Sequence, residues 1–220
     1  MRKLLCGLIM AIGLVTIQLQ ANEYREGKQY KVLNEAVFVE SAKDKIEVGT
    51  VFWYGCPHCY DLEKRMVGWK KTLASDVRMV KIPVIFGRPW QAHAQLFYTV
   101  ENMGLGEKVN NAIFESVQVE GKRLDKPADM ADFLYQNFEV NKKTFLSTYD
   151  SFGVRSQCQK AYAIAKGAQL VGVPALIIDG RYVVDPLSAG GLDKMLNVAD
   201  VLIEKVRREK SLQQKRVVSD

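Results

Sequence analysis

Two cysteines separated by two residues constrain this chain more than any other feature of its sequence. The tetrapeptide Cys56-Pro57-His58-Cys59 follows Lys45 to Tyr54 (KIEVGTVFWY), a β-branched and aromatic run that predicts a buried strand. Pro57 suits the first turn of a helix. The apolar residues behind it recur at helical spacing: Leu62, Met66, Trp69 and Leu73. The sequence therefore predicts a CxxC motif at the join between a strand and a helix, where such a motif is typical of a redox dithiol.

The predicted position of the motif assigns a different task to each cysteine. Cys56 falls at the helix N-terminus, where unpaired backbone N–H groups and the helix dipole favour a thiolate. Cys59 lies one turn further along and is expected to be more buried. His58 would lower the pKa of the Cys56 thiol further. A stabilised thiolate makes the disulfide a stronger oxidant, so the motif favours oxidation of other proteins over their reduction.

Two structural interpretations of the CxxC motif compete with this one. A zinc site would need two further ligands, and the remaining candidates, Cys158, His58 and His93, do not form a second paired motif. A purely structural disulfide across so short a loop would remove little chain entropy from the unfolded state. We therefore expect neither a metal nor an organic cofactor at the motif.

The remainder of the chain predicts a mixed sheet with helices on its faces. Val77 to Phe86 is interpreted as a second strand, and helical periodicity dominates between residues 87 and 161. Asp179-Gly180 lies between two apolar runs, Ala175 to Ile178 and Tyr182 to Val184, and predicts a β-hairpin. A closing helix is expected from about Leu192 to Arg207. An α/β fold with a helical insertion follows from this order.

The first 21 residues have the layout of a secretory signal peptide. Arg2 and Lys3 precede an apolar stretch from Leu4 to Leu19, and Ala21 offers a small residue before a polar segment. The alternative is an uncleaved anchor, but the stretch is shorter than the roughly 20 residues that a spanning helix needs. We therefore expect residues 22–220 to be exported to the periplasm, an oxidising compartment.

The basic residues of the chain do not indicate nucleic-acid binding. The formal net charge is +6, and the densest basic run, Lys205 to Arg216, contains Glu209, follows Glu204 and has no aromatic residue. This run is interpreted as a solvated helix end and tail rather than a nucleic-acid patch.

The segment from Phe52 to Tyr60 (FWYGCPHCY) closely resembles the active-site segment of the DsbA family, the periplasmic dithiol oxidases of Gram-negative bacteria. Gly172-Val173-Pro174-Ala175 resembles the family's cis-proline loop. The resemblance implies a thioredoxin-like domain over residues 22–86 and 162–220, interrupted by a helical domain over residues 87–161. It also implies that Val173 and Pro174 lie against the dithiol, with the Val173 backbone pairing with substrate.

One position departs from the family pattern. The family commonly has a buried glutamate six residues before the first cysteine, and this chain has Thr50 there. Glu47 is no simple replacement, because an offset of three along a strand reverses the side chain's direction. Lys81 stands where the family has a lysine near that acid, and Glu63 is one helical turn beyond Cys59. Thr50, Glu63 and Lys81 are therefore the candidates for the proton path.

The resulting functional prediction is a periplasmic protein disulfide oxidase. Its expected partners are reduced, unfolded exported proteins and a membrane oxidase such as DsbB that restores the disulfide, and the protein is expected to act as a monomer. Two alternatives remain: an isomerase or reductase of the same fold, and a copper-delivery protein using Cys56, Cys59 and His58. Cys158 is interpreted as a small buried hydrophobic residue, and Trp53, Trp69 and Trp90 as core or groove-lining residues.

Overall fold

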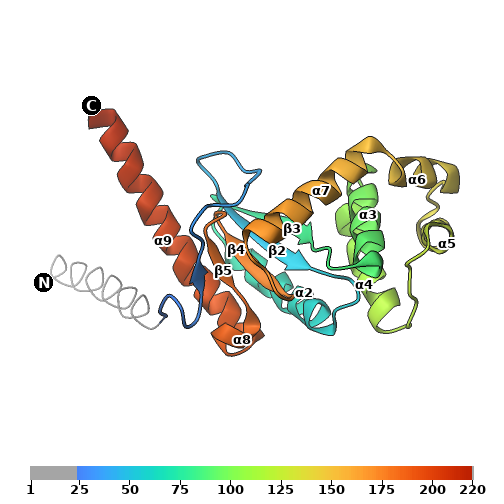
Figure 1. Ribbon diagram of the computed structural model, residues 1–220, viewed down its shortest axis with the longest axis horizontal. Helices are drawn as coiled ribbons and strands as arrows, with labels where there is room; N and C mark the ends of the chain where they lie inside the picture. Colours follow the sequence, from blue (N-terminus) through green and yellow to red (C-terminus); the bar gives the residue numbers. More distant parts are fainter. Residues whose placement is uncertain (1–23, 220) are drawn as a thin grey trace, which may run out of the picture.

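A computed structural model describes residues 24–219 of the chain (Figure 1). The predicted signal peptide, residues 1–21, lies outside the described residues. In chain order the elements are β1 (Lys31–Val32), β2 (Ile46–Phe52), α2 (Pro57–Trp69), the 3-10 helix η1 (Lys70–Thr72), β3 (Val77–Pro83), α3 (Arg88–Asn102), α4 (Gly106–Gln118), α5 (Pro127–Phe138), α6 (Lys142–Tyr149), α7 (Phe152–Gly167), β4 (Ala175–Ile178), β5 (Tyr182–Val184), α8 (Pro186–Ala189) and α9 (Leu192–Ser219).

The five strands form one mixed sheet in the order β1-β5-β4-β2-β3. Strands β2 and β3 run parallel, whereas β4 pairs antiparallel with β2 and β5 antiparallel with β4. The predicted hairpin turn is confirmed: Asp179 and Gly180 both have positive φ, of 51° and 69°. A Cβ at position 180 would lie 2.4 Å from the carbonyl oxygen of Val37, so the turn needs glycine there. The predicted mixed sheet with flanking helices is confirmed.

Helices cover both faces of the sheet (Figure 1). On one face, α2 and α9 pack their apolar residues against alternate residues of β2 and β4, as in the cluster of Val48, Met66, Ile178 and Leu202. On the other face, Ile164 of α7 and its neighbours pack against the strand residues whose side chains point to that face, such as Val51 and Ile177. The sheet is thereby buried on both sides, which fixes the direction in which the end of β2 points.

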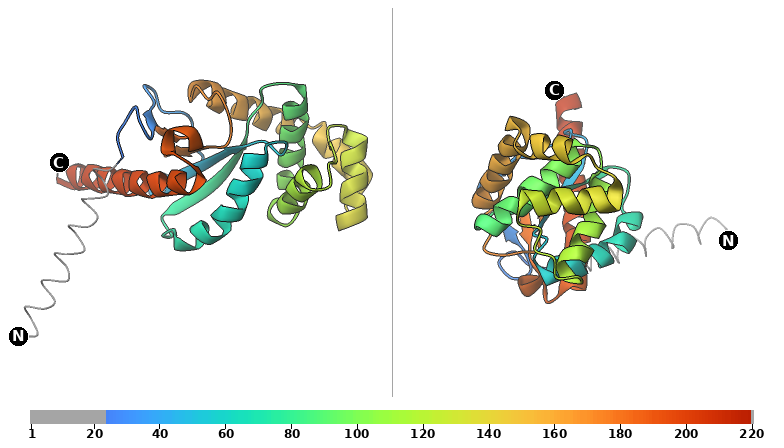
Figure 2. Two further views of the ribbon diagram at one scale, coloured as in Figure 1. Left: turned by 90° about the horizontal axis from the view of Figure 1, so that it is seen from below. Right: turned by 90° about the vertical axis from the view of Figure 1, so that its right-hand side faces the viewer.

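Helices α3 to α6 lie beyond one end of the sheet, and α9 extends past the other end (Figure 2). Phe52 and Tyr54, at the end of β2 and just after it, are buried in the same cluster as Phe114 and Leu134 of these helices. The helical block therefore packs directly against the segment that leads into the dithiol. The predicted domain limit at residues 161 and 162 falls inside the continuous helix α7, and the division into domains stays a prediction.

Several predicted boundaries differ from the observed ones. The first long strand is shorter, Ile46–Phe52, and the second ends at Pro83 rather than Phe86, because Pro83 is the register partner of Phe52, where the neighbouring strand β2 ends. Leu73 lies beyond α2, because η1 tightens the chain before it. Strand β1 was not predicted, since two residues carry no periodicity.

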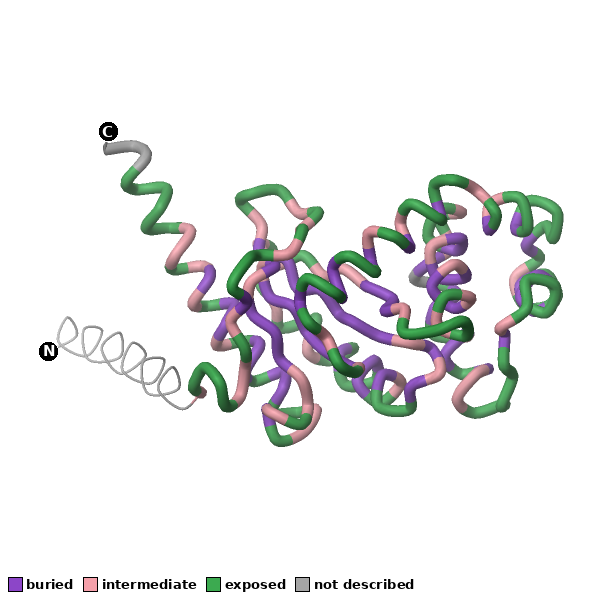
Figure 3. The backbone as a smooth tube through the Cα atoms, viewed as in Figure 1, coloured by how far each residue is buried: buried purple, intermediate pink, exposed green. Residues whose placement is uncertain are grey.

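The closing helix α9 continues to Ser219, well past the predicted end near Arg207. The residues after Arg207 are good helix formers, and side chains of this stretch bind the sheet end: Glu209 pairs with Arg181 and Lys210 with Asp179. Residues 211–216 of α9 are exposed (Figure 3). Within residues 24–219, no helix is both long and apolar enough to cross a membrane.

Candidate active site

The dithiol lies where β2 ends and α2 begins, as the sequence predicts. Cys56 is the N-cap residue of α2, and its carbonyl oxygen accepts hydrogen bonds from the N–H groups of Cys59 at 3.1 Å and Tyr60 at 3.2 Å. Cys56 is 8% exposed and Cys59 is 1% exposed, so only the first sulfur lies near the surface. Both cysteines are in the thiol form. The two sulfurs therefore differ in their accessibility, as expected for one cysteine at the start of a helix and one a turn further along.

The loop before β4 lies against Cys56. The Val173–Pro174 peptide bond is cis, and the thiol of Cys56 lies 3.6 Å from the carbonyl oxygen of Val173. Val171, two residues earlier, is fully exposed. The structure therefore brings together residues 56 and 173, which are far apart in the sequence, with an exposed apolar side chain beside them. Val171 was not predicted from sequence as a site residue, although its place next to the loop was the available signal.

The two thiols have opposite pKa shifts. The pKa of Cys56 is lowered to about 6, chiefly because the Cys59 thiol donates a hydrogen bond to the Cys56 sulfur. The backbone N–H groups of Cys59 and His58 and the charge of His58 lower this pKa further, whereas burial raises it. The pKa of Cys59 is raised, first by burial and then by the Cys56 sulfur, with a smaller contribution from Glu63. At neutral pH the reduced site therefore holds one thiolate, on Cys56.

The thiolate should be directly measurable. We expect a midpoint near 6 when the ultraviolet absorbance of the reduced protein is titrated with pH, because Cys56 has its pKa lowered to about 6. His58→Leu should raise the midpoint modestly, since His58 supplies the smaller share of the shift. Cys158→Ala is the matched control and should leave the titration unchanged. A midpoint near the free-cysteine value of about 8.5 would contradict this account.

The three candidates for the proton path lie together beneath the dithiol. Thr50 of β2 pairs in register with Lys81 of β3, so their side chains share one face of the sheet. The ammonium of Lys81 lies 2.5 Å from the carboxylate of Glu63, which projects from α2 one turn beyond Cys59. Burial lowers the pKa of Lys81, and the Glu63 charge opposes that shift. Thr50 Oγ1 is buried and has no hydrogen-bond partner among the described residues.

Glu47 has a different task. Its carboxylate accepts hydrogen bonds from the backbone N–H groups of Glu40 and Ser41, at 2.7 and 2.9 Å, and from the Ser41 hydroxyl at 2.7 Å. It therefore holds the segment before β2 against the sheet. This leaves Glu63 as the buried carboxylate that faces Lys81.

Aromatic side chains hold the segment between β2 and the dithiol. Trp53 stacks on Trp90 of α3 with ring centroids 4.0 Å apart. The Tyr54 hydroxyl donates to Asn110 of α4 at 2.9 Å, and the Gln118 side chain donates to the Tyr54 carbonyl at 2.6 Å. Asn110 and Gln118 were not identified from sequence, because nothing local marks a residue whose hydrogen-bond partner lies 50 or more positions away.

The remaining candidates do not join the dithiol. Cys158 is buried in α7 beside Ala94 and Val154, and burial raises its pKa to about 11, as expected of a packed thiol. The third tryptophan, Trp69, donates to Asp200 of α9 at 2.8 Å. Among residues 24–219, no group of three or more His, Cys, Asp and Glu side chains could hold a metal ion.

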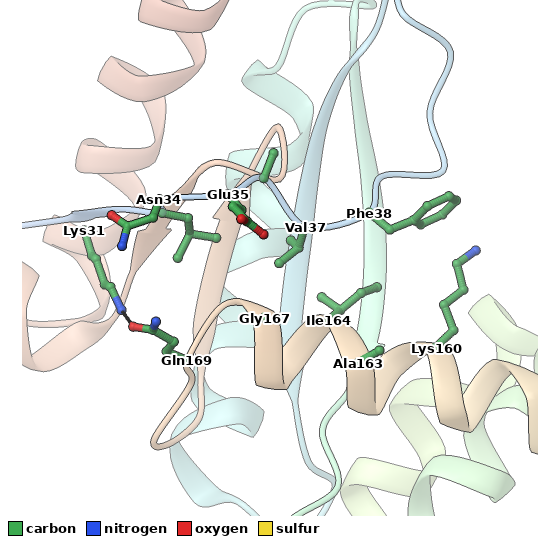
Figure 4. A pocket seen from close by; sticks show the side chains of 12 residues that line it. Lys31, Asn34, Glu35, Val37, Phe38, Lys160, Ala163, Ile164, Gly167 and Gln169 are labelled. Atoms are coloured by element: carbon green, nitrogen blue, oxygen red, sulfur yellow. Dashed lines mark hydrogen bonds between the residues drawn. The ribbon is translucent and has the colours of Figure 1, made fainter.

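Two cavities flank the sheet away from the dithiol. One, of about 780 Å³, runs beside β3 and is lined in part by Thr50, Glu63 and Lys81. The other, of about 470 Å³, lies between residues 33–38 and α7 (Figure 4). Lys31, which binds Gln169, closes one end of this second cavity in Figure 4. Neither cavity includes Cys56, Cys59 or Val173 in its lining.

Comparison with known proteins agrees with this geometry. The sequence profile of the DSBA-like thioredoxin domain matches residues 47–202. The chain belongs to this family. Its relatives named thiol:disulfide interchange protein DsbA include one from Pseudomonas syringae pv. tomato, 48% identical over 200 residues that cover 90% of this chain and 92% of the relative.

Solved structures of family members resemble the whole fold. Crystal structures of DsbA from Pseudomonas aeruginosa match with a TM-score of 0.81 at 44% identity, over 87% of this chain and 98% of that one. DsbA from Xylella fastidiosa matches with a TM-score of 0.79 at 26% identity, over 84% and 98%. The resemblance inferred from FWYGCPHCY and the Val-Pro loop is confirmed. The roles of individual residues rest on the geometry described above.

Proposed function

We propose that this protein is a thiol:disulfide oxidoreductase that oxidises pairs of cysteines in exported proteins. The observation that carries the proposal is the pair of opposite pKa shifts, lowered to about 6 for Cys56 and raised for Cys59, in a dithiol at a helix N-terminus. A stabilised Cys56 thiolate favours the reduced form of the site. A site whose reduced form is favoured readily transfers its disulfide to the thiols of another protein.

The exchange proceeds in two balanced steps. A substrate thiolate attacks Cys56 Sγ of the Cys56–Cys59 disulfide; a mixed disulfide forms, and Cys59 leaves as a thiolate and takes a proton. A second substrate thiolate then attacks the substrate sulfur of the mixed disulfide, and Cys56 leaves as the stabilised thiolate. The substrate loses two electrons and gains a disulfide, and the enzyme dithiol carries the electrons.

The cis-proline loop supports a role in substrate binding. The Val173 carbonyl lies beside Cys56, within reach of the backbone of an extended chain whose cysteine is bonded to that sulfur. Val171, two residues before Val173, is fully exposed and offers an apolar surface to the same chain. Pro57 and His58 are both exposed and face the same incoming chain.

The cellular setting belongs to the same proposal. The signal-like segment 1–21 directs the chain to the periplasm, where reduced, unfolded exported proteins are its substrates. A DsbB-like membrane oxidase linked to quinone accepts the two electrons and restores the disulfide. The protein acts as a monomer and needs no bound cofactor, since the substrate and this partner supply and remove both electrons.

The proposal predicts a strongly oxidising dithiol. At equilibrium with glutathione at pH 7, the site should be almost wholly reduced at ratios that leave an ordinary structural disulfide oxidised. The reduced protein should accordingly resist urea more than the oxidised one, by about 2 kcal/mol above about pH 8.5 after allowance for solvent screening of the Cys56 charge, and by less at pH 7.

The pH dependence of this difference follows from the sign of the shift. The Cys56 pKa is depressed in the folded protein, so the advantage of the reduced form is complete above the unfolded pKa, about 8.5. It is lost as pH falls through the folded value of about 6. An oxidised form that is the more stable one at pH 7 would overturn the oxidase assignment in favour of a reductase. Copper retained after purification, with no dithiol oxidation, would favour the delivery protein.

A further inference from the structure

Strand β3 is an edge of the sheet, and one side of its backbone is open. The Ile46 N–H donates to Asp76 O at 2.8 Å, and the Val84 N–H donates to Phe52 O at 3.0 Å. These bonds show that the backbone N–H and C=O groups of the even-numbered residues of β3 point toward β2. Because the backbone direction alternates along a strand, the N–H and C=O groups of Met79 and Lys81 point away from β2. No described residue bonds to these four groups.

The open side of β3 faces the larger cavity. This cavity of about 780 Å³ includes Met79 and Lys81 in its lining, so the unpaired backbone borders a groove rather than a flat surface. The end of α2 and η1 form one wall of the groove, and α3 and α7 form the other. A groove with a strand edge along it suits an extended chain better than a compact small molecule.

The acidic and the basic side chains that line the groove differ in whether they have binding partners. Four acidic residues line the groove, and none of them is free: Glu47 binds residues 40 and 41, Glu40 pairs with Lys160, Glu63 pairs with Lys81, and Glu101 is also engaged. The exposed basic side chains of Lys70, Lys71 and Arg78 form no ion pair with any described residue. The groove therefore presents unpaired positive charge beside unpaired backbone.

We propose that this groove binds an extended, acidic segment of polypeptide as an added strand on β3. The backbone of the segment pairs with Met79 and Lys81, and its carboxylates meet Lys70, Lys71 and Arg78. The inference rests on the proposed function in taking an unfolded substrate chain as the occupant. A chain held here stays tethered while its cysteines react at Cys56, which raises their local concentration.

A cysteine-free peptide tests the groove separately from the dithiol. The probe is an end-blocked, fluorescein-labelled nine-residue peptide that alternates Glu with Val, bound to the full mature protein at low salt. We expect saturable binding and slower hydrogen exchange at the Met79 and Lys81 amides. Lys70→Glu with Lys71→Glu should weaken binding at least tenfold. The matched control, Lys126→Glu with Lys143→Glu on α5 and α6, should not.

Backbone methylation separates strand addition from charge attraction. Two derivatives of the peptide, N-methylated at every Glu or at every Val, carry the same charge. Strand addition requires that one derivative bind at least tenfold more weakly than the other, since only one keeps the N–H groups that pair with β3. Equal binding, or exchange protection at Val173 instead of Met79, overturns the proposal. Oxidation of a two-cysteine peptide is measured in parallel, and its loss would count against the proposed oxidase alone.

Discussion

Replacing Cys59 with Ala should make mixed disulfides between Cys56 and exported proteins accumulate. Cys56 is the sulfur near the surface, beside the Val173 carbonyl, and without Cys59 the normal intramolecular route of resolution is gone. The variant loses the hydrogen bond that contributes most to the low pKa of Cys56, so its thiolate should titrate higher than that of the native protein. The measurement is non-reducing electrophoresis of periplasmic extracts with antibody detection of this protein.

The controls separate the roles of the three cysteines. Cys56→Ala should abolish both trapping and dithiol oxidation, a loss of at least a thousandfold in rate, because the buried Cys59 has a raised pKa and remains protonated. Cys158→Ala should behave as native in both assays, since this thiol is buried in α7. Equal trapping by the Cys56 and Cys59 variants would contradict the assignment of attacked and resolving sulfur.

The site could be predicted from sequence wherever its parts are close along the chain. The dithiol at the strand–helix join, the greater burial of Cys59 and the turn at Asp179-Gly180 all follow from spacing and residue type within about ten residues. The cis bond before Pro174 was expected from the resemblance to the family and not from the chain's own pattern. Local chemistry thus predicted which residues matter, while their mutual contact required the fold.

Features that depend on tertiary contacts were predicted poorly. The extension of α9 depends on pairs such as Arg181 with Glu209, which join residues 28 positions apart. The largest cause of the low pKa of Cys56 is the Cys59 thiol, whereas the sequence argument credited the helix terminus and His58. The open edge of β3 could not be foreseen either, because the strand order decides which strand lies outermost.

Glu63→Gln should slow at least tenfold the attack of Cys59 on mixed disulfides, which is the reverse of the first exchange step. Thr50 cannot titrate in the useful range, so Glu63 is the buried carboxylate left near Cys59, whose pKa it helps to raise. A positioned acid or base is worth roughly a hundredfold or more in proton transfer. The cavity beside β3 reaches Glu63, Lys81 and Thr50, which gives a proton from Cys59 a path to solvent.

A loss of stability must be separated from a loss of proton transfer. Glu63→Gln leaves the Lys81 ammonium buried without its partner, at a cost of about 3 kcal/mol. Lys81→Gln removes the same ion pair and keeps the carboxylate, so it is the matched control for stability. Stopped-flow resolution rates are measured for both variants from pH 5 to 9. A proton role for Glu63 predicts a changed pH profile of the rate in Glu63→Gln and a native-like profile in Lys81→Gln.

Thr50→Glu tests whether a carboxylate on β2 can replace Glu63 in proton transfer with Cys59. The new side chain would share a face with Lys81, its register partner, and a second buried carboxylate there should lower stability unless that ammonium neutralises it. We expect the rate of thiol exchange to change more than its equilibrium, because the Cys56 thiolate sets the equilibrium. In the double variant with Glu63→Gln, rescue of the rate would show that the position of the carboxylate is interchangeable. If neither single variant alters resolution, water alone carries the proton and Glu63 serves only to pair with Lys81.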